Sequence, residues 1–277
     1  MHEPPLLDTS VPHPARVYDY WLGGKDNFAA DREAAEAGFA AWPGVLSSVR
    51  ANRAFLRRMV GHLAVEAGIR QFLDIGSGLP TASNTHEVAQ AAEPSCRVVY
   101  ADNDPVVLLH ARNLLASSPE GATDYLQADI REPGEILEGA ARTLDFTRPV
   151  AVMMLGILHF LVAEDDPYGI VARFMAAVAP GSYLAISHLA SDVNPDVMAE
   201  FTRSMHERGV RDRLRSRAEV GRFFDGLELL EPGVVLVSKW RPDSDLEVRA
   251  GTSLWGGVAR KPAVRISSAD CGGRTTG

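Results

Sequence analysis

The chain has 277 residues, of which 46% are hydrophobic and 23% are charged, an ordinary composition for a soluble globular protein. This length allows one large α/β domain, or one such domain with a modest extension. The formal net charge of −8 argues against a general surface for nucleic acid or for anionic membranes.

The first part of the chain is predicted to be helical. An alanine-rich stretch at 26–42 begins with an aspartate, which favours a helix N-terminus, and is followed by a Pro-Gly pair that breaks the helix. Apolar residues then recur at helical spacing over 45–68. We therefore expect residues 1–67 to form a helical N-terminal extension.

From residue 70 the sequence alternates between strand and helix patterns. The expected strands are 71–76, 96–102, 123–129, 149–156 and 181–188. The expected helices are 83–92, 104–117, 133–142, 164–179, 194–208 and 216–224. Continuous apolar strands that alternate with helices predict a mostly parallel sheet with helices on both faces.

The C-terminal part is predicted to end this sheet with a reversed strand. Residues 227–240 and 254–262 could pair as an antiparallel edge. The fold class is therefore α/β, a Rossmann-like doubly wound sheet with a reversed C-terminal edge strand and an N-terminal helical extension. We expect residues 68–266 to form the ligand-binding domain and residues 267–277 to be a disordered tail.

Acidic residues lie at or near the ends of three successive strands. They are Asp74, Asp102 and Asp129, and Gly156 ends the fourth strand. In an open α/β sheet the ligand binds beyond the carboxyl ends of the strands. These residues are therefore expected to surround a ligand, although each carboxylate could instead cap loop amides or a turn.

The glycine loop after the first strand does not suit a phosphate. Gly76-Ser77-Gly78 lacks the third glycine of the dinucleotide fingerprint, and the Walker pattern is absent. Asp74 precedes the loop, and residues 71–96 contain no Lys or Arg to offset its charge. A nucleotide-dependent oxidoreductase is therefore disfavoured.

A ligand with a cationic amino group and a sulfonium centre fits this loop better. Asp74 would attract the positive charge, and the two glycines let the backbone come close. Asp102 lies 24 residues after Gly78, where an acid can accept hydrogen bonds from both ribose hydroxyls. Asp129 can meet an adenine amino group. Amine, ribose and adenine together describe S-adenosylmethionine, with S-adenosylhomocysteine as the product form.

Several motifs resemble those of class I S-adenosylmethionine-dependent methyltransferases. They read DIGSG, ADNDP, QADIREP and AVMMLGILHFL. More closely, residues 12–262 resemble an actinobacterial family of such enzymes, formerly known only as a domain of unknown function. Its hallmark is the stretch that here reads PARVYDYWLGGKDNFAADREAAE, at 14–36. The resemblance implies a seven-stranded sheet with a reversed last strand, S-adenosylmethionine as methyl donor, and no metal.

The resemblance also implies roles for individual residues. Carried over by position, Gly76, Ser77 and Gly78 would line the methionine part, Asp102 and Asn103 the ribose, and Asp129 and Ile130 the adenine. The chain departs from the pattern at Leu79-Pro80, where many methyltransferases have a third small residue. The loop must therefore leave the glycines in a different direction.

The N-terminal motif suggests a lid over the ligand, or an aromatic staple that pins the extension to the sheet. As a lid, Tyr18 or Tyr20 would face the methyl group. Lys25 and Asn27 follow in a loop before the next helix and are expected at the ligand, where Lys25 would pair with the methionine carboxylate. Arg16 is an alternative partner, and so are Asn52 and Arg53.

His159, just past the fourth strand, is the candidate general base, and His188 is the other candidate. Either histidine could instead be a packed core residue. The sequence has no Asn-Pro-Pro-Tyr-type signature of amino-group methylation after the fourth strand. No metal site is expected, because Cys96 and Cys271 are too few for a zinc cluster.

We interpret the chain as an S-adenosylmethionine-dependent methyltransferase that acts on a small molecule at oxygen, nitrogen or carbon. The alternative is a non-catalytic protein that binds S-adenosylmethionine or S-adenosylhomocysteine as a sensor. The two cysteines, the absence of a secretory signal and the absence of a long apolar stretch indicate the cytoplasm. The acceptor and the oligomeric state are not predicted.

Overall fold

The structure is a computed structural model, and it describes residues 8–80, 83–107, 117–249 and 251–263. The predicted tail at 267–277 and most of the predicted helix at 104–117 lie outside the described residues. Among the other expected elements, each of the five parallel strands is present within three residues of its predicted bounds.

Eight strands of the described chain form one sheet in the order β3-β2-β1-β4-β5-β8-β6, with β7 also paired to β8. Their bounds are β1 Gln71–Ile75, β2 Arg97–Asp102, β3 Ala122–Gln127, β4 Ala151–Leu155, β5 Tyr183–Leu189, β6 Glu228–Leu229, β7 Val235–Leu236 and β8 Leu254–Arg260. Strands β1 to β5 pair in parallel, and β8 runs antiparallel to β5. The Rossmann-like class and the reversed edge strand are therefore confirmed.

The described sheet has eight strands rather than the expected seven, and the difference lies at its outer edge. The short strands β6 and β7 both pair with β8, one after the other along its length. Pro232, which has no N–H to donate, and Gly233, which has a φ of +82°, lie between them. The last position in the sheet is therefore split into two strands.

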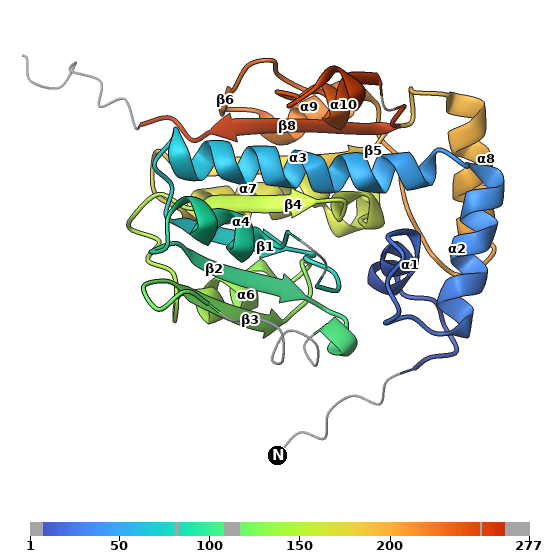
Figure 1. The fold of residues 1–277 in the computed structure, drawn as a ribbon, viewed down its shortest axis with the longest axis horizontal. Helices are drawn as coiled ribbons and strands as arrows, with labels where there is room; N and C mark the ends of the chain where they lie inside the picture. Colours follow the sequence, from blue (N-terminus) through green and yellow to red (C-terminus); the bar gives the residue numbers. More distant parts are fainter. Residues whose placement is uncertain (1–7, 81–82, 108–116, 250, 264–277) are drawn as a thin grey trace, which may run out of the picture.

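The helices lie on both faces of the sheet (Figure 1). The α-helices are α1 Pro14–Trp21, α2 Ala29–Ala41, α3 Val45–Val65, α4 Thr85–Ala92, α6 Pro133–Ala140, α7 Pro167–Ala177, α8 Pro195–His206, α9 Arg217–Gly221 and α10 Asp245–Arg249. The 3₁₀ helices are η1 Leu158–Phe160, η2 Ala163–Asp165, η3 Arg222–Phe224 and η4 Val237–Lys239. Four of the α-helices begin with proline at the first position, where the missing N–H costs no helical bond.

Each face of the sheet has its own apolar core. Phe72 of β1 packs with residues of α3 and α4, whereas Leu73 and Ile75 pack with residues of α6 and α7. Successive side chains of a strand point to opposite faces, so a strand covered on both faces is apolar throughout. This explains the continuous apolar runs that predicted the parallel sheet.

Helices α1, α2 and α8 lie beyond the carboxyl ends of the parallel strands (Figure 1). Helix α1 is tied to the loop after β2, because Arg16 and His13 both pair with the buried Asp104, at 3.2 and 3.1 Å. In contrast, α3 lies along the sheet and shares a core with β1. The division of the chain at residue 68 stays a prediction.

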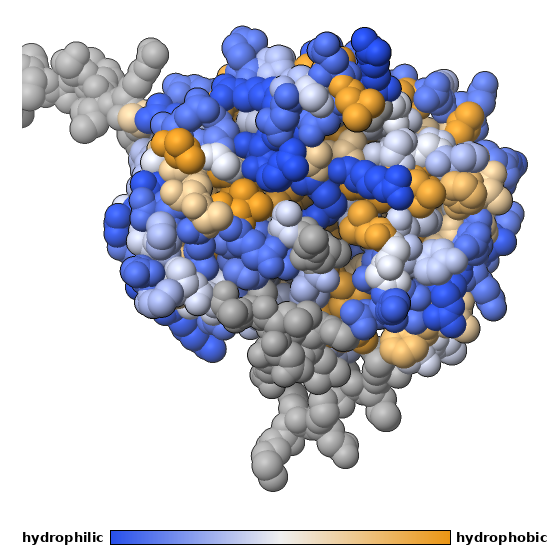
Figure 2. Space-filling model, in the orientation of Figure 1, coloured by the Kyte–Doolittle hydropathy of each residue, from blue (hydrophilic) through white to orange (hydrophobic). Residues whose placement is uncertain are grey.

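The visible face of the molecule is mostly hydrophilic, with hydrophobic residues in small separate patches (Figure 2). Exposed large apolar side chains include Val65 and Leu246. Such scattered residues are normal for a folded protein. None of the helices in the described ranges is long and apolar enough to cross a membrane.

Candidate functional site

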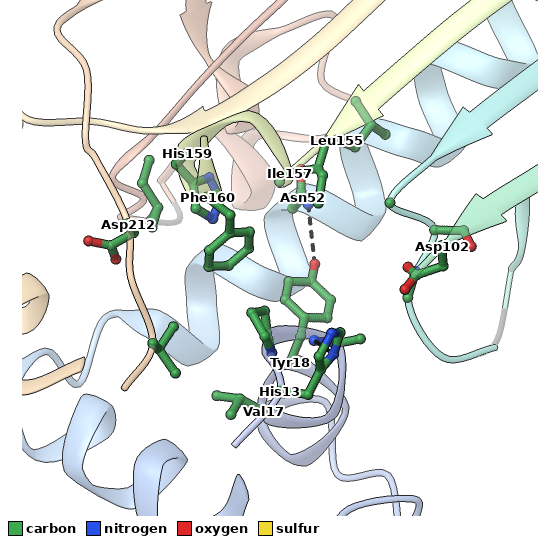
Figure 3. Close-up of a pocket in the computed structure, with 18 of the residues that line it drawn as sticks. His13, Val17, Tyr18, Asn52, Asp102, Leu155, Ile157, His159, Phe160 and Asp212 are labelled. Carbon is green, nitrogen blue, oxygen red and sulfur yellow. Dashed lines mark hydrogen bonds between the residues drawn. The ribbon is translucent and has the colours of Figure 1, made fainter. Parts of the chain in front are cut away.

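A cavity of about 360 Å³ lies beyond the carboxyl ends of β1, β2 and β4. The strand order reverses between β1 and β4, which is where open α/β sheets bind ligands. Helix α1, the first half of α3, η1 and the segment after α8 supply the other walls. Figure 3 shows Asp102 on one side of the cavity, His159 and Phe160 on the other, and Tyr18 and Asn52 between them.

The glycine loop bends tightly at both of its glycines. Gly76 has a φ of +70°, and a Cβ there would lie 2.6 Å from the Ile157 side chain. Gly78 has a φ of +67°, and a Cβ there would meet nothing within 4 Å. The Gly76 amide donates to the Ala101 carbonyl at 2.8 Å. Gly76 is thus required by both backbone conformation and packing, whereas Gly78 borders open space in the cavity.

Asp102 is fixed by backbone amides at the end of β2. Its carboxylate accepts from the Gly78 N–H at 2.8 Å and from the Asp104 N–H at 3.0 Å. Burial raises the pKa of Asp102, and the two amides oppose that shift. A carboxylate has about four lone-pair positions, so two further donors can still bind. Asp102 also lines the cavity.

Asp74 is buried at the end of β1. Its carboxylate accepts a hydrogen bond from the Thr85 hydroxyl at 2.6 Å. Burial raises the pKa of Asp74 to about 6, while Thr85 and the positive charge of Arg53 favour the ionised form. Both Asp74 and Arg53 line the cavity. A negative and a positive group therefore lie at the same end of the glycine loop.

Asp129 belongs to a small polar network after β3. It accepts from the Asn103 side-chain amide at 3.1 Å and from the Arg131 guanidinium at 3.2 Å. Arg131 also donates to Asp165 at 2.8 Å. The buried Ile130 lies next to this network, and Asn103, Asp129, Ile130 and Arg131 all line the cavity. An apolar surface flanked by polar groups can hold a flat heterocycle.

Tyr18 and Asn52 form the middle of the cavity wall. The Tyr18 hydroxyl donates to the Val49 carbonyl at 3.2 Å and accepts from Asn52 Nδ2 at 3.2 Å. Burial raises the pKa of Tyr18, so the phenol is neutral. Asn52 lies beside Gly156, where a Cβ would be 3.6 Å from Asn52 Nδ2. Tyr18 is therefore oriented by α3 and lies opposite the end of β4.

His159 is a buried histidine on η1 that lines the cavity. Its Nδ1 has no hydrogen-bond partner among the described residues. Burial holds the pKa of His159 well below its usual range, and the neighbouring His188 and Arg215 lower it further. The imidazole is thus neutral at physiological pH.

His188 does not line the cavity. Arg215 donates to His188 Nε2 at 2.9 Å, and His188 Nδ1 lies 2.8 Å from the Leu189 carbonyl. Burial lowers the pKa of His188 to about 3, which keeps this ring neutral as well. Of the two candidate bases, only His159 therefore reaches the cavity.

Most of the predicted site residues come together around the cavity. Those that line it are Tyr18, Asp74, Gly76, Ser77, Gly78, Asp102, Asn103, Asp129, Ile130, Gly156 and His159. The roles predicted for them remain predictions, but the sheet places them in one site. Arg16, an alternative carboxylate partner, pairs instead with Asp104.

Three predicted site residues, Tyr20, Lys25 and Asn27, do not line the cavity in this structure. The Tyr20 hydroxyl donates to Glu36. Lys25 is exposed, and the Asn27 side chain donates to Asp19 at 2.8 Å. The reason is the turn after α1, where Gly23 has a φ of +83° and Asp19 also accepts from the Asp26 amide. These contacts hold the following loop against α1 and away from the cavity.

Sequence reasoning missed much of the rest of the lining. Arg53 was only an alternative, and His13 and Arg131 were not considered for the site, although Arg131 follows Asp129 in the QADIREP motif.

No group of three His, Cys, Asp or Glu side chains suited to a metal ion occurs among the described residues.

The cavity has two chemically different halves. The acidic half lies at the ends of β1, β2 and β3 and consists of Asp74, Gly76, Ser77, Gly78, Asp102, Asn103, Asp129 and Ile130. The aromatic half lies among α1, α3, η1 and α8 and consists of Trp21, Trp42, Val45, Val49, Phe160, Phe201, Met205 and Val210. Tyr18 and Asn52 lie where the halves meet, and His159 lies beside Phe160 (Figure 3).

Comparison with solved structures finds two similar chains of almost the same extent. A DUF574-family protein from Streptomyces avermitilis MA-4680 is 48% identical, with a TM-score of 0.89 over 92% of this chain and 99% of that one. A methyltransferase candidate from Thermobifida fusca YX is 44% identical, with a TM-score of 0.86 over 94% of this chain and 98% of that one. Both come from actinobacteria, as predicted.

More distant structures share the fold alone. An O-methyltransferase family protein from Burkholderia thailandensis is 16% identical, with a TM-score of 0.52 over 75% of this chain and 55% of that one. No curated protein matches the chain.

A family model described as S-adenosyl methyltransferase matches residues 1–262. This match covers the N-terminal motif, the glycine loop and all eight strands. It confirms, at the level of the family, the predicted class and the predicted cofactor, S-adenosylmethionine. The chain belongs to the S-adenosyl methyltransferase family.

Proposed function

We propose that this chain binds S-adenosylmethionine in the acidic half of the cavity and transfers its methyl group to a small molecule held in the aromatic half. The observation that carries the proposal is the geometry of Asp102. Its carboxylate is buried, held by two backbone amides, and still borders the cavity. A fixed acceptor of this kind suits a pair of ribose hydroxyls.

The remaining groups of the acidic half fit the other parts of the cofactor. Asp74 would attract the amino group of the methionine part, and Arg53 would pair with its carboxylate. The open space beside Gly78 lets the backbone approach that part closely. Ile130 would pack against the adenine, with Asn103 and Asp129 at its edge.

Methyl transfer requires little covalent chemistry from the protein. The cofactor, when bound, supplies a methyl group that is already activated by its sulfonium. The chain contributes proximity and orientation of the two reactants. His159 lines the cavity beside Phe160, and its Nδ1 has no partner among the described residues, so it is the side chain that would take a proton from the acceptor.

A small acceptor fits the site better than a polymer. Helix α1 and residues 209–212 both form walls of the cavity, so it is covered rather than open along its length. The chain also has a formal net charge of −8, which disfavours nucleic acid as the substrate.

The test is isothermal titration with S-adenosylhomocysteine. Wild-type protein should bind in the micromolar range. Asp102→Ala should weaken binding roughly 100-fold, because hydrogen bonds to a charged group contribute about 1.5–3 kcal/mol each. Asp145→Ala is the matched control, because Asp145 is exposed and accepts from Thr147 outside the cavity.

Two results would contradict the proposal. If wild-type protein does not bind S-adenosylhomocysteine, the acids of the cavity are structural caps. If it binds but transfers no methyl group to any component of a small-molecule metabolite extract, the non-catalytic alternative is favoured.

A further inference from the structure

We propose that the methyl acceptor is an uncharged, apolar ring compound and that the methylated atom is the oxygen of a hydroxyl group on its ring. This inference rests on the proposed function and identifies the class of substrate for the same cavity. It comes from the shape of the aromatic half, from the placement of its charges, and from the buried base at its edge.

The aromatic half is lined mainly by aromatic and apolar side chains, some of which pack against one another. Phe201 of α8 meets Trp42 edge-on, with ring centroids 5.3 Å apart, and lies 6.1 Å from Trp21. Met205, one turn further along α8, adds a thioether, which makes favourable contacts with aromatic rings. Aromatic side chains that line a cavity gain energy by packing against a flat apolar ligand.

Two charged residues, Arg211 and Asp212, also line this end of the cavity. The Asp212 carboxylate lies 3.1 Å from His206 Nε2. It points away from Phe160 and Tyr18 (Figure 3). Arg211 is exposed to solvent. An ionised substituent on the ring would therefore lose its hydration and meet only charges that are already paired or solvated, which is costly. The acceptor should be neutral.

The reacting atom is indicated by His159. His159 lines the cavity, and its Nδ1 is buried and has no partner within the described chain. A Cβ built on Gly156 would lie 4.0 Å from His159 Cε1, so the ring is close to the end of β4. Buried polar atoms are normally paired, so a ligand donor is expected at Nδ1.

A hydroxyl group needs such a base, whereas a neutral amine does not. An amine nitrogen already carries a free lone pair, but a hydroxyl oxygen becomes a strong nucleophile only as its proton leaves. His159 is placed for this task by geometry, because it lines the cavity beside Phe160 and its Nδ1 has no partner within the described chain. The Arg213 amide donates to the His159 carbonyl at 2.7 Å and fixes this part of η1.

The reaction balances with these groups alone. The hydroxyl proton moves to His159 Nδ1 as an oxygen lone pair forms the new bond to the methyl carbon. The bond between that carbon and sulfur breaks, and its electron pair stays on the sulfur. The products are the methyl ether and S-adenosylhomocysteine, and the proton on His159 later passes to solvent.

The experiment compares three probes on one ring system: 2-naphthol, 2-naphthylamine and 2-naphthoate. Each is incubated with full-length protein and S-adenosylmethionine that carries a trideuterated methyl group, and products are identified by mass spectrometry. We expect 2-naphthol to be methylated on oxygen at least roughly 10-fold faster than the amine, because the base assists only the hydroxyl compound. We expect 2-naphthoate to be inert, because it is charged.

Variants of two histidines identify the base. His159→Gln should lower kcat for 2-naphthol roughly 100-fold and leave its KM and the affinity for S-adenosylhomocysteine unchanged. His62→Gln is the control, because His62 contacts Glu66 and Arg241 and does not line the cavity. Retained affinity for S-adenosylhomocysteine also shows that the variant is folded.

The outcomes separate this inference from the proposed function. If wild-type protein binds S-adenosylhomocysteine but does not methylate 2-naphthol, or prefers the amine or the carboxylate, the inference is wrong and the proposed function stands. An unchanged kcat in His159→Gln would also overturn it. If S-adenosylhomocysteine itself does not bind, the proposed function fails first.

Discussion

The two halves of the cavity are built in different ways. In the acidic half, polar side chains at the ends of neighbouring strands are fixed by short bonds, such as that from the Gly78 amide to Asp102. In the aromatic half, apolar side chains come from helices that are distant in the sequence, such as Trp42 after α2 and Phe201 on α8.

This difference shows which part of the site depends on the sheet and which part depends on the helices that pack beyond it. Strand ends meet at one edge because of the sheet topology, so the acidic half follows directly from the fold. The aromatic half depends on how α1, α2 and α8 pack together beyond that edge (Figure 1). We therefore expect the first half to recognise the cofactor and the second to recognise the acceptor.

The largest effect is expected from the loop that shapes the acidic half. Gly76→Ala should lower the free energy of unfolding by roughly 3 kcal/mol, because it adds strain at positive φ and a clash with Ile157. Gly78→Ala should cost only about 1 kcal/mol, because its Cβ would enter open space. Urea denaturation measures both values. Equal losses would show that packing at Gly76 does not matter.

Affinity for the cofactor should depend on pH through Asp74. Its pKa is raised to about 6 by burial, so it gains a proton below that pH and no longer attracts a cationic amine. S-adenosylhomocysteine should bind up to about 10-fold more weakly at pH 5 than at pH 7.5. Titrations across this range measure the change.

The control for this prediction is Asp74→Asn, which should flatten the pH profile of binding.

The stability of the free protein should show the opposite trend with pH. Because the folded pKa lies above the unfolded value of 3.8, the folded state binds the proton more tightly, and this contribution to stability rises as pH falls from about 6 to 4. If Asp74→Asn leaves the pH profile of binding unchanged, Asp74 is not the source of the pH dependence.

A pair of variants should affect the two halves separately. Arg53→Met should weaken S-adenosylhomocysteine binding roughly 10-fold, because it removes the proposed partner of the carboxylate. Val210→Asn should leave that binding within about 2-fold but weaken 2-naphthol binding to the loaded protein roughly 10-fold, because it makes an apolar wall polar. Calorimetry measures both ligands.

Arg50→Met is the control for the first variant, because Arg50 is exposed on the same helix and does not line the cavity. If either Arg53→Met or Val210→Asn weakened both ligands equally, the separation of the two halves would be lost.

The smallest effect is expected at a residue that lies outside both halves. Lys25→Met should leave the affinity for S-adenosylhomocysteine within about 2-fold, because Lys25 is exposed and does not reach the cavity. The same titration tests it. A loss of 10-fold or more would mean that the N-terminal loop moves onto the cofactor.

The sheet and the acidic half could be predicted from sequence because their signals are local. An apolar run marks each strand, and a following acid such as Asp74 or Asp102 marks its carboxyl end. Parallel topology then brings these ends together. Among the predicted cofactor residues, those on strand ends all line the cavity.

The remainder depends on three-dimensional packing that local patterns do not encode. Tyr18 and Tyr20 are two residues apart on one helix, but only Tyr18 faces the cavity. From sequence alone, Arg53 is no better a candidate than Lys25 for the partner of the methionine carboxylate. The turn at Gly23 directs the Lys25 loop away from the cavity, and local patterns do not predict this direction. The aromatic half draws on segments from Trp21 to Val210, whose contact follows from the packing of α2 against α8.

The most direct test of the two-half account is a crystal structure of the protein with S-adenosylhomocysteine bound. The account predicts that both ribose hydroxyls donate to Asp102, that the adenine packs on Ile130, and that the aromatic half of the cavity remains free for the acceptor. An adenine in the aromatic half, or an Asp102 without contact to the ligand, would contradict it.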